Sequence, residues 1–261
     1  MVNKITIITV CFNAEKTIAE TIESVLSQDY PIYQYIIVDG KSTDGTIRII
    51  NRYTSKFQEK GIRFVYYSEE DEGIFDAMNK GIKYASGDWV YFLNSDDTLY
   101  SQDTIKKVFS SDYEDVDCVY GDTVNKHGKQ IYYRASLPID VVTYRNPYVH
   151  QALFCKRGIL EKYSFDTNYK YSADFDQCVR MYVDGISFRH ISIPIALFSL
   201  EGRSQKDFRI GVKEFERIRK NNGIAGRDWL KRHMLYMAVF VIKGNIHVYR
   251  LYALIKKGVK E

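Results

Sequence analysis

The first hundred residues alternate between strand-like and helix-like hydrophobic patterns, and this alternation constrains the fold more than any other feature. Residues 5–11 form a continuous apolar, β-branched run, which is typical of a strand covered on both faces. The same reading predicts strands at 35–38, 63–67 and 88–93, with helices at about 13–28, 43–53 and 74–84 between them. Such alternation indicates an α/β fold with a doubly wound, mostly parallel sheet.

Polar residues follow three of these predicted strands. They are Thr9 to Asn13, Asp39, and Asn94 to Asp97. In doubly wound sheets, ligands bind beyond the carboxyl ends of the strands. We therefore expect all three groups to meet at one edge of the sheet.

The paired acids Asp96 and Asp97 end the apolar stretch YFLNSDD. Adjacent carboxylates repel each other, and a divalent cation such as Mn²⁺ or Mg²⁺ would relieve that repulsion, since hard cations prefer carboxylate oxygen. A solvated turn that caps a helix starting near Thr104 is the structural alternative.

After Asp97 the pattern becomes mixed. We expect strands at 116–120, 129–134, 151–155, 186–191 and 195–200, and a helix that starts after Ser172 and stops at Gly185. These strands would form a small antiparallel part of the same domain, which we place at residues 1–204. Residues 205–261 carry 14 Lys and Arg against five Asp and Glu, and we expect a basic, helical C-terminal extension there.

Composition excludes several classes of protein. The four cysteines are widely spaced without a C-x-x-C pair, so neither a disulfide framework nor a zinc site is expected. The apolar start is too short for a signal peptide, and no stretch reaches the ~20 apolar residues of a membrane span. We therefore expect a cytoplasmic protein.

Its amphipathic tail would pack on the domain, on a second copy, or on a membrane surface, and the oligomeric state stays open. No nucleic-acid-binding module accompanies the basic residues.

Five motifs in order resemble bacterial family 2 glycosyltransferases with the GT-A fold. They are TVCFNAEKTIAETIESVLSQ, YIIVDGKSTDGT, DEGIFDAMNKGIKYASGDWVYFLNSDD, HQALFCKRGIL and SADFDQCVR. The resemblance runs from about Lys4 to Ser204 and is strongest to the branch that assembles capsule, O-antigen or colanic acid.

The resemblance implies roles at the matching positions of the nucleotide-sugar site. Thr9, Phe12 and Asn13 would lie at the nucleotide, and Asp39 would accept a hydrogen bond from the base or ribose of a UDP-sugar. Asp97 would ligate Mn²⁺ or Mg²⁺, with Asp96 reaching the ribose or a metal-bound water. The chain departs from the commoner D-x-D-D form because Asn94 stands at the first position.

Further roles implied by the resemblance concern the sugar and the acceptor. Asp174 would be the catalytic base, ionised at the start of a helix. Asp176, two residues on, points elsewhere on that helix, and we expect it to be a solvated first-turn acid favoured by the helix dipole. Asp76 and His150 would contact the donor sugar or the acceptor, and Arg203 would contact the diphosphate.

The expected activity is inverting, metal-dependent transfer from a nucleotide-sugar, with a UDP-sugar favoured. The acceptor would be a saccharide or a polyprenyl-diphosphate-linked saccharide in cell-surface polysaccharide synthesis. Two alternatives stay open at this point. One is a non-catalytic nucleotide-sugar-binding or scaffold subunit at the membrane, which would be indifferent to Asp174→Asn. The other is a nucleotidyltransferase, although the stretch CFNAEKT lacks the Gly-rich loop that such enzymes carry after the first strand.

Overall fold

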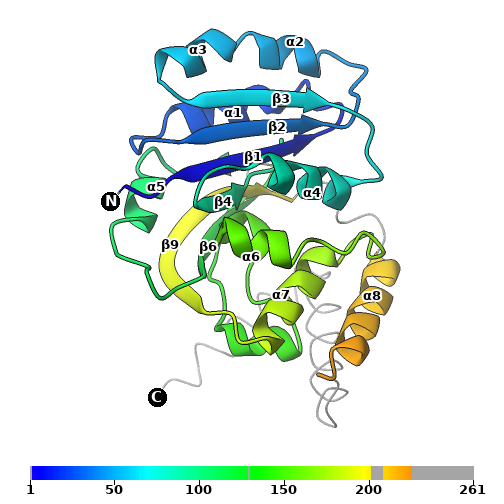
Figure 1. Cartoon of the computed structure of the whole chain (residues 1–261). Helices are drawn as coiled ribbons and strands as arrows, with labels where there is room; N and C mark the ends of the chain where they lie inside the picture. Colours follow the sequence, from blue (N-terminus) through cyan, green and yellow to red (C-terminus); the bar gives the residue numbers. More distant parts are fainter. Residues whose placement is uncertain (1, 129, 201–207, 225–261) are drawn as a thin grey trace.

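One mixed sheet organises the molecule. A computed structural model of the chain describes residues 2–128, 130–200 and 208–224 (Figure 1). The strand order is β3-β2-β1-β4-β8-β6-β9-β5, and β7 pairs with β6 beside this path. Helices cover both faces of the sheet, as the alternating pattern predicts.

The first half of the sheet is parallel and agrees with the sequence prediction. Its strands are β1 (Ile5–Cys11), β2 (Gln34–Asp39), β3 (Arg63–Ser68) and β4 (Trp89–Phe92). Successive side chains of β1 enter different layers of the core, because strand residues alternate between faces. Ile5 and Ile7 pack in the layer that contains α1 (Ile18–Leu26), while Ile8 and Val10 pack in the layer that contains α4 (Ile74–Tyr84).

The second predicted helix is in fact two short helices, α2 (Thr46–Asn51) and α3 (Thr54–Glu59). Asp44 Oδ1 accepts a hydrogen bond from the Thr46 N–H at 2.9 Å, so this side chain satisfies a backbone donor at the start of α2. Phe57 of α3 is fully buried and packs on Tyr35 of β2 at a ring distance of 5.1 Å. The two helices therefore cover the β3 edge of the sheet (Figure 1).

The second half of the sheet is mixed. β8 (Leu153–Lys156) pairs antiparallel with β4 and with β6 (Cys118–His127), and β6 pairs parallel with β9 (Phe188–Ser199). The short strand β5 (Thr98–Leu99) and the edge strand β7 (Gln130–Arg134) complete it. The connections contain the helices α5 (Thr104–Val108), η1 (Ile139–Thr143), η2 (His150–Ala152) and α6 (Arg157–Lys162).

The prediction of two strands at 186–191 and 195–200 is wrong, because β9 continues through Pro194. Pro194 lies opposite Asp122, where the register of β6 and β9 shifts. Proline is tolerated at such an irregularity because the ladder there does not require its missing N–H. β9 can therefore run from the base of the domain to the edge that carries the site.

The last described helices pack together beside the second half of the sheet. α7 (Ala173–Val183) buries Phe175, whose ring stacks on Phe215 of α8 (Phe208–Asn221) at 3.7 Å. The buried Glu214 carboxylate accepts hydrogen bonds from the N–H groups of Lys170 at 2.7 Å and Tyr171 at 2.9 Å. The compact unit thus extends past the boundary predicted at residue 204. The remainder of the expected basic extension, residues 225–261, lies outside the described residues.

No helix within residues 2–128, 130–200 and 208–224 combines the length and apolar character needed to cross a bilayer.

Glu214→Gln tests how far α8 belongs to the domain. Glutamine removes the charge and presents an N–H group to one of two backbone donors, which leaves a buried donor unsatisfied. We expect the free energy of unfolding to fall by about 1–3 kcal/mol, measured by urea denaturation. Glu216→Gln, an exposed change on the same helix, is the control and should alter stability by less than about 0.5 kcal/mol.

Candidate active site

The carboxyl ends of β1, β2 and β4 meet at one edge of the sheet, as expected from parallel neighbours. Cys11, at the end of β1, is paired in register with Asp39, at the end of β2. The loop after β3 reaches the same edge, because a side chain at Gly40 would collide with the Asp71 carboxylate. The loops after β1, β2 and β4 therefore lie at one edge, where the sequence placed the polar groups, and the loop after β3 joins them.

Asp39 is fully buried and surrounded by donors from this chain. Its carboxylate accepts hydrogen bonds from Ser42 N–H at 3.0 Å, from Ser68 Oγ at 2.7 Å and from Ser42 Oγ. The Cys11 thiol points at Oδ1 from 3.6 Å, and burial together with the Asp39 charge raises the pKa of that thiol. Sequence analysis missed Ser42 and Ser68, although the polar run after Asp39 was a signal for the first.

Asn13 connects the loop after β1 to the loop after β2 through hydrogen bonds. Its backbone φ is 51°, in the left-handed region that Asn tolerates better than most residues. The Asn13 N–H donates to Ser42 Oγ at 2.8 Å, and its Oδ1 accepts from Thr43 N–H at 2.8 Å. The helix predicted from about residue 13 begins later, at Ile18, with Thr17 at its N-cap position, so Asn13 belongs to the loop. Phe12 beside it is 44% exposed and is the most accessible ring of this loop.

Thr9 is further from the surface than expected. Its side chain is fully buried, and its hydroxyl accepts a hydrogen bond from Tyr35 Oη at 3.0 Å. Thr9 therefore joins β1 to β2 inside the core and does not line an open pocket.

The two acids after β4 have different environments. The Asp97 carboxylate is buried and accepts hydrogen bonds from Gln151 Nε2 at 2.7 Å and from the Ser199 N–H at 2.8 Å. Its own carbonyl accepts a third bond from Thr21 Oγ1 at 2.7 Å. Asp96 is only half-buried. Burial raises the pKa of both carboxyls, and the charge of Asp96 raises that of Asp97 further.

A chain of side chains links this loop to α7. Asn94 Nδ2 lies 3.3 Å from His150 Nε2, and His150 Nδ1 lies 3.6 Å from Asp174 Oδ2. If Asn94 donates to Nε2, then Nδ1 carries the ring proton and faces the Asp174 carboxylate. His150 thus brings the predicted base within reach of the predicted metal motif. This convergence of residues 94, 150 and 174 follows from the pairing of β4 with β8, which no local pattern encodes.

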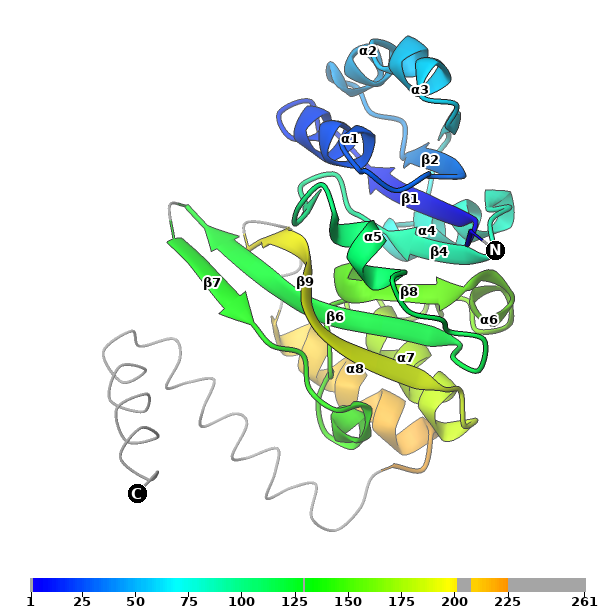
Figure 2. The same ribbon diagram turned by 90° about the vertical axis from the view of Figure 1, so that its left-hand side faces the viewer.

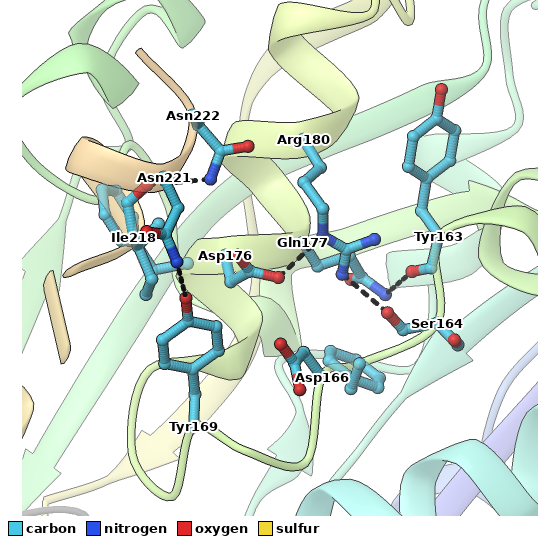
Figure 3. A network of polar contacts seen from close by, with 12 residues as sticks. Tyr163, Ser164, Asp166, Tyr169, Asp176, Gln177, Arg180, Ile218, Asn221 and Asn222 are labelled. Atoms are coloured by element: carbon cyan, nitrogen blue, oxygen red, sulfur yellow. Dashed lines mark hydrogen bonds and ion pairs between the residues drawn. The ribbon is translucent and has the colours of Figure 1, made fainter. Parts of the chain in front are cut away.

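Asp174 and Asp176, which share the first turn of α7, have different surroundings. Asp174 is partly exposed toward His150. Asp176 is buried and pairs with Arg180 at 2.7 Å, which in turn donates to the Ser164 carbonyl at 2.7 Å (Figure 3). Burial raises the pKa of the Asp176 carboxyl against the opposing effect of Arg180. Arg180 therefore holds the Asp176 carboxylate inside the protein, and the expectation of a solvated first-turn acid is wrong.

Of the two remaining predicted residues, Asp76 lies within the described part of the chain. Asp76 forms an i,i+4 ion pair with Lys80 at 3.1 Å and accepts a bond from the Glu72 N–H at 3.2 Å, so it orders the start of α4. Arg203 lies outside the described residues.

The residues after β4 suit a divalent cation that takes most of its ligands from a bound substrate. Asp96 offers a carboxylate at a partly open position, and Asn94 Oδ1 is a buried acceptor without a hydrogen-bond partner. Oxygen ligands of this kind favour Mg²⁺ or Mn²⁺ over softer metals. Within the described residues, no three His, Cys, Asp or Glu side chains gather into a cage. Diphosphate oxygens would have to complete the coordination.

The mixed sheet, with polar residues at the carboxyl ends of β1, β2 and β4, is that of the GT-A fold. Residues 6–173 match the model of glycosyl transferase family 2, and the chain belongs to that family. It is therefore a glycosyltransferase enzyme, which removes the non-catalytic and nucleotidyltransferase alternatives.

Two curated relatives are similar over different shares of the chain. A PGL/p-HBAD biosynthesis glycosyltransferase of Mycobacterium bovis is 28% identical over 191 residues, which is 72% of this chain and 73% of the relative. The putative teichuronic acid biosynthesis glycosyltransferase TuaG of Bacillus subtilis is 41% identical over 103 residues, 40% of this chain and 39% of its own.

Two solved structures share the fold at low sequence identity. Residues 1–349 of S. aureus TarS in complex with UDP-GlcNAc superpose with a TM-score of 0.71 at 18% identity, covering 89% of this chain and 73% of that one. The mannosyltransferase PcManGT of Pyrobaculum calidifontis, in complex with GDP-Man and Mn²⁺, gives a TM-score of 0.65 at 20% identity, covering 87% and 66%.

Alanine substitutions should separate the two adjacent acids by their effect on stability. Asp97→Ala leaves the Gln151 amide and the Ser199 N–H without their buried acceptor, and we expect a loss of about 2–5 kcal/mol in the free energy of unfolding. Asp96→Ala removes a half-buried carboxylate and should change stability by less than about 1 kcal/mol. Urea denaturation measures both. Equal losses would contradict the different roles that the contacts assign.

Proposed function

We propose that this chain is an inverting, metal-dependent glycosyltransferase that uses a nucleotide-sugar, with a UDP-sugar favoured. The observation that carries the proposal is the grouping of Asp96, His150 and Asp174 beside the loops that follow β1 and β2. The acceptor we propose is a saccharide or a lipid-linked saccharide in cell-surface polysaccharide synthesis. The names of the teichuronic acid and PGL/p-HBAD relatives support that acceptor class, and a lipid-linked acceptor suits a cytoplasmic enzyme.

We propose Asp96, in place of Asp97, as the direct ligand of Mn²⁺ or Mg²⁺. Both Asp97 oxygens already accept hydrogen bonds inside the protein, and a cation there would have to displace them. The Asp96 carboxylate is not held by two buried donors in this way, and its side chain is only half-buried. A bound cation supplies Lewis-acid stabilisation of the departing diphosphate. Asp97 then acts as a positioning residue, since it fixes the backbone from which Asp96 projects.

We propose Asp174 as the base that takes the proton of the acceptor hydroxyl. It lies in the first turn of α7, near the positive end of the helix dipole. Its Oδ1 accepts a hydrogen bond from the Phe175 N–H at 2.8 Å, and Oδ2 faces His150. His150 would orient this carboxylate, so that the hydroxyl attacks the anomeric carbon from the face opposite the leaving group. Direct displacement of that kind inverts the configuration.

The nucleotide would lie over the loops that follow β1 and β2. Phe12 is exposed there and offers an apolar face for the base, while Asn13 holds its loop against Ser42 and Thr43. Asp39 would act mainly through these loops, because its carboxylate holds Ser42 and Ser68. Asp76 and Arg203 stay predictions at the sugar and the diphosphate.

Asp174→Asn tests the proposed base. The amide keeps the shape of the side chain but cannot accept a proton, so we expect kcat to fall by about 10²–10⁴-fold while UDP still binds. The assay follows release of UDP from a panel of UDP-sugars with saccharide acceptors. Asp176→Asn on the same helix is the control. It should lower stability through the lost Arg180 pair yet keep transfer at a temperature where the variant is folded.

Calorimetric titration with UDP and GDP, each with and without Mn²⁺, tests the donor and the metal. We expect UDP to bind more tightly than GDP, and Mn²⁺ to strengthen binding, since diphosphate and Asp96 share the cation. In Asp96→Ala the gain from Mn²⁺ should be lost, while metal-free binding of UDP is kept. Preference for GDP would redirect the donor to a GDP-sugar, and a full Mn²⁺ effect in Asp96→Ala would remove Asp96 as the ligand.

A further inference from the structure

The hairpin of β6 and β7 displays apolar side chains at its surface. On the edge strand β7, Ile131 is 64% exposed, Tyr132 48% and Tyr133 57%. Because strand side chains alternate, Ile131 and Tyr133 share one face of the hairpin with Lys126, the partner of Ile131, and Tyr132 lies on the other face. Burying such side chains is favourable, so a run of three at the surface indicates a contact that is not made within the described chain. Figure 2 shows the hairpin extending away from the body of the sheet.

The same hairpin is basic and lacks acids. Residues 123–134 contain Lys126, Lys129 and Arg134 together with His127, and no Asp or Glu, in a chain that has 33 acidic residues. The described side chains Lys126 and His127 are exposed. Apolar and cationic groups are therefore presented together, which complements a surface that is anionic outside and apolar beneath.

The base of the hairpin is held firmly. The buried Asp122 carboxylate accepts a hydrogen bond from Tyr133 Oη, lies 2.9 Å from His190 Nε2, and accepts another from the Ser136 N–H at 2.8 Å. These contacts anchor β7 to β6 and β9. The exposed side chains at Ile131 and Tyr132 are thus carried by a fixed strand pair, which lowers the entropy lost when they bind.

The hairpin is also connected to the candidate active site. Lys126 is paired in register with Ser199, whose N–H donates to the Asp97 carboxylate at 2.8 Å. Lys126 and Ser199 are thus the point at which the hairpin leaves the edge that carries Asp96 and Asp97. A surface that contacts the hairpin tip would therefore lie near the edge that carries Asp96 and Asp97.

We propose that the hairpin docks the enzyme on an anionic lipid bilayer. Tyrosine suits the boundary between headgroups and acyl chains because its ring is apolar and its tip polar, Ile131 supplies aliphatic area, and the cations attract anionic headgroups. A saccharide partner would use the tyrosines but has little use for an exposed isoleucine beside them. A second copy of the chain would present like charge, because its own hairpin carries the same exposed Lys126. The docking stands independently of the transfer reaction, and only its purpose, presenting a lipid-linked acceptor, rests on the proposed function.

The test is co-sedimentation of the full chain with vesicles of phosphatidylcholine, with and without phosphatidylglycerol. We expect binding only when the anionic lipid is present, and weaker binding as salt is raised. Ile131→Gln combined with Tyr132→Gln should lower the partition coefficient by about tenfold or more. Lys126→Gln should lower it by roughly fivefold. These variants leave the Asp122 contacts intact, and circular dichroism checks their folding.

Matched controls separate the hairpin from the rest of the chain. Val183→Gln removes an exposed apolar side chain at the end of α7, and Lys83→Gln removes an exposed cation on α4. Both should bind vesicles like the wild type. Hairpin variants that also bind like the wild type would overturn the proposal and assign any membrane contact elsewhere. Two other results would also overturn it: a hairpin variant that loses self-association, or affinity for a soluble anionic polysaccharide, with unchanged vesicle binding.

Because vesicle binding needs neither nucleotide nor acceptor, its failure and the failure of the glycosyltransferase assignment are distinguishable. An enzyme that transfers sugar to a soluble acceptor but ignores anionic vesicles would refute the docking alone. An enzyme that binds vesicles through the hairpin but ignores all nucleotide-sugars would refute the donor alone.

Discussion

The buried carboxylate of Asp97 joins the two halves of the sheet. It follows β4 directly, and its oxygens accept hydrogen bonds from Gln151 before β8 and from Ser199 at the end of β9. Removing a carboxylate from water is unfavourable, and these donors offset only part of the cost, as the raised pKa of Asp97 indicates. The position is retained at that cost because one side chain fixes three segments that must meet at the site. These contacts of Asp97 also fix the backbone beside Asp96.

Much of the parallel half could be predicted because its information is local. The apolar runs of β1 to β4 and the helical spacing of residues 74–84 each fall within one short window of sequence. The edge at which Asp39 and Asp96 meet follows from parallel pairing alone. The mixed half was harder, because β9 passes through Pro194 at a register shift that only its partner strand explains. The helix break between α2 and α3 and the docking of α8 depend likewise on tertiary contacts.

In the site, too, local sequence identifies candidate residues, whereas their roles depend on tertiary contacts. The sequence places two acids side by side but cannot distinguish them, since the donors to the buried one, Gln151 and Ser199, are 54 and 102 residues away. Thr9 and Asp39 follow a pattern shared with binding loops, yet their oxygens are occupied by Tyr35, Ser42 and Ser68. The place of His150 in the site depends on its contacts with Asn94 and Asp174, which are distant in the sequence.

Asn94 shows how the local charge limits what this edge can bind. Asp96 and Asp174 already lie near His150, and Asp97 lies beside Asp96, so a fourth carboxylate at position 94 would raise the repulsion further. The neutral amide avoids that repulsion and still contacts His150. A diphosphate approaching these acids is repelled unless a cation lies between them. These acidic charges therefore make metal and donor binding mutually dependent, and a neutral amide at position 94 leaves more of the coordination sphere to the donor.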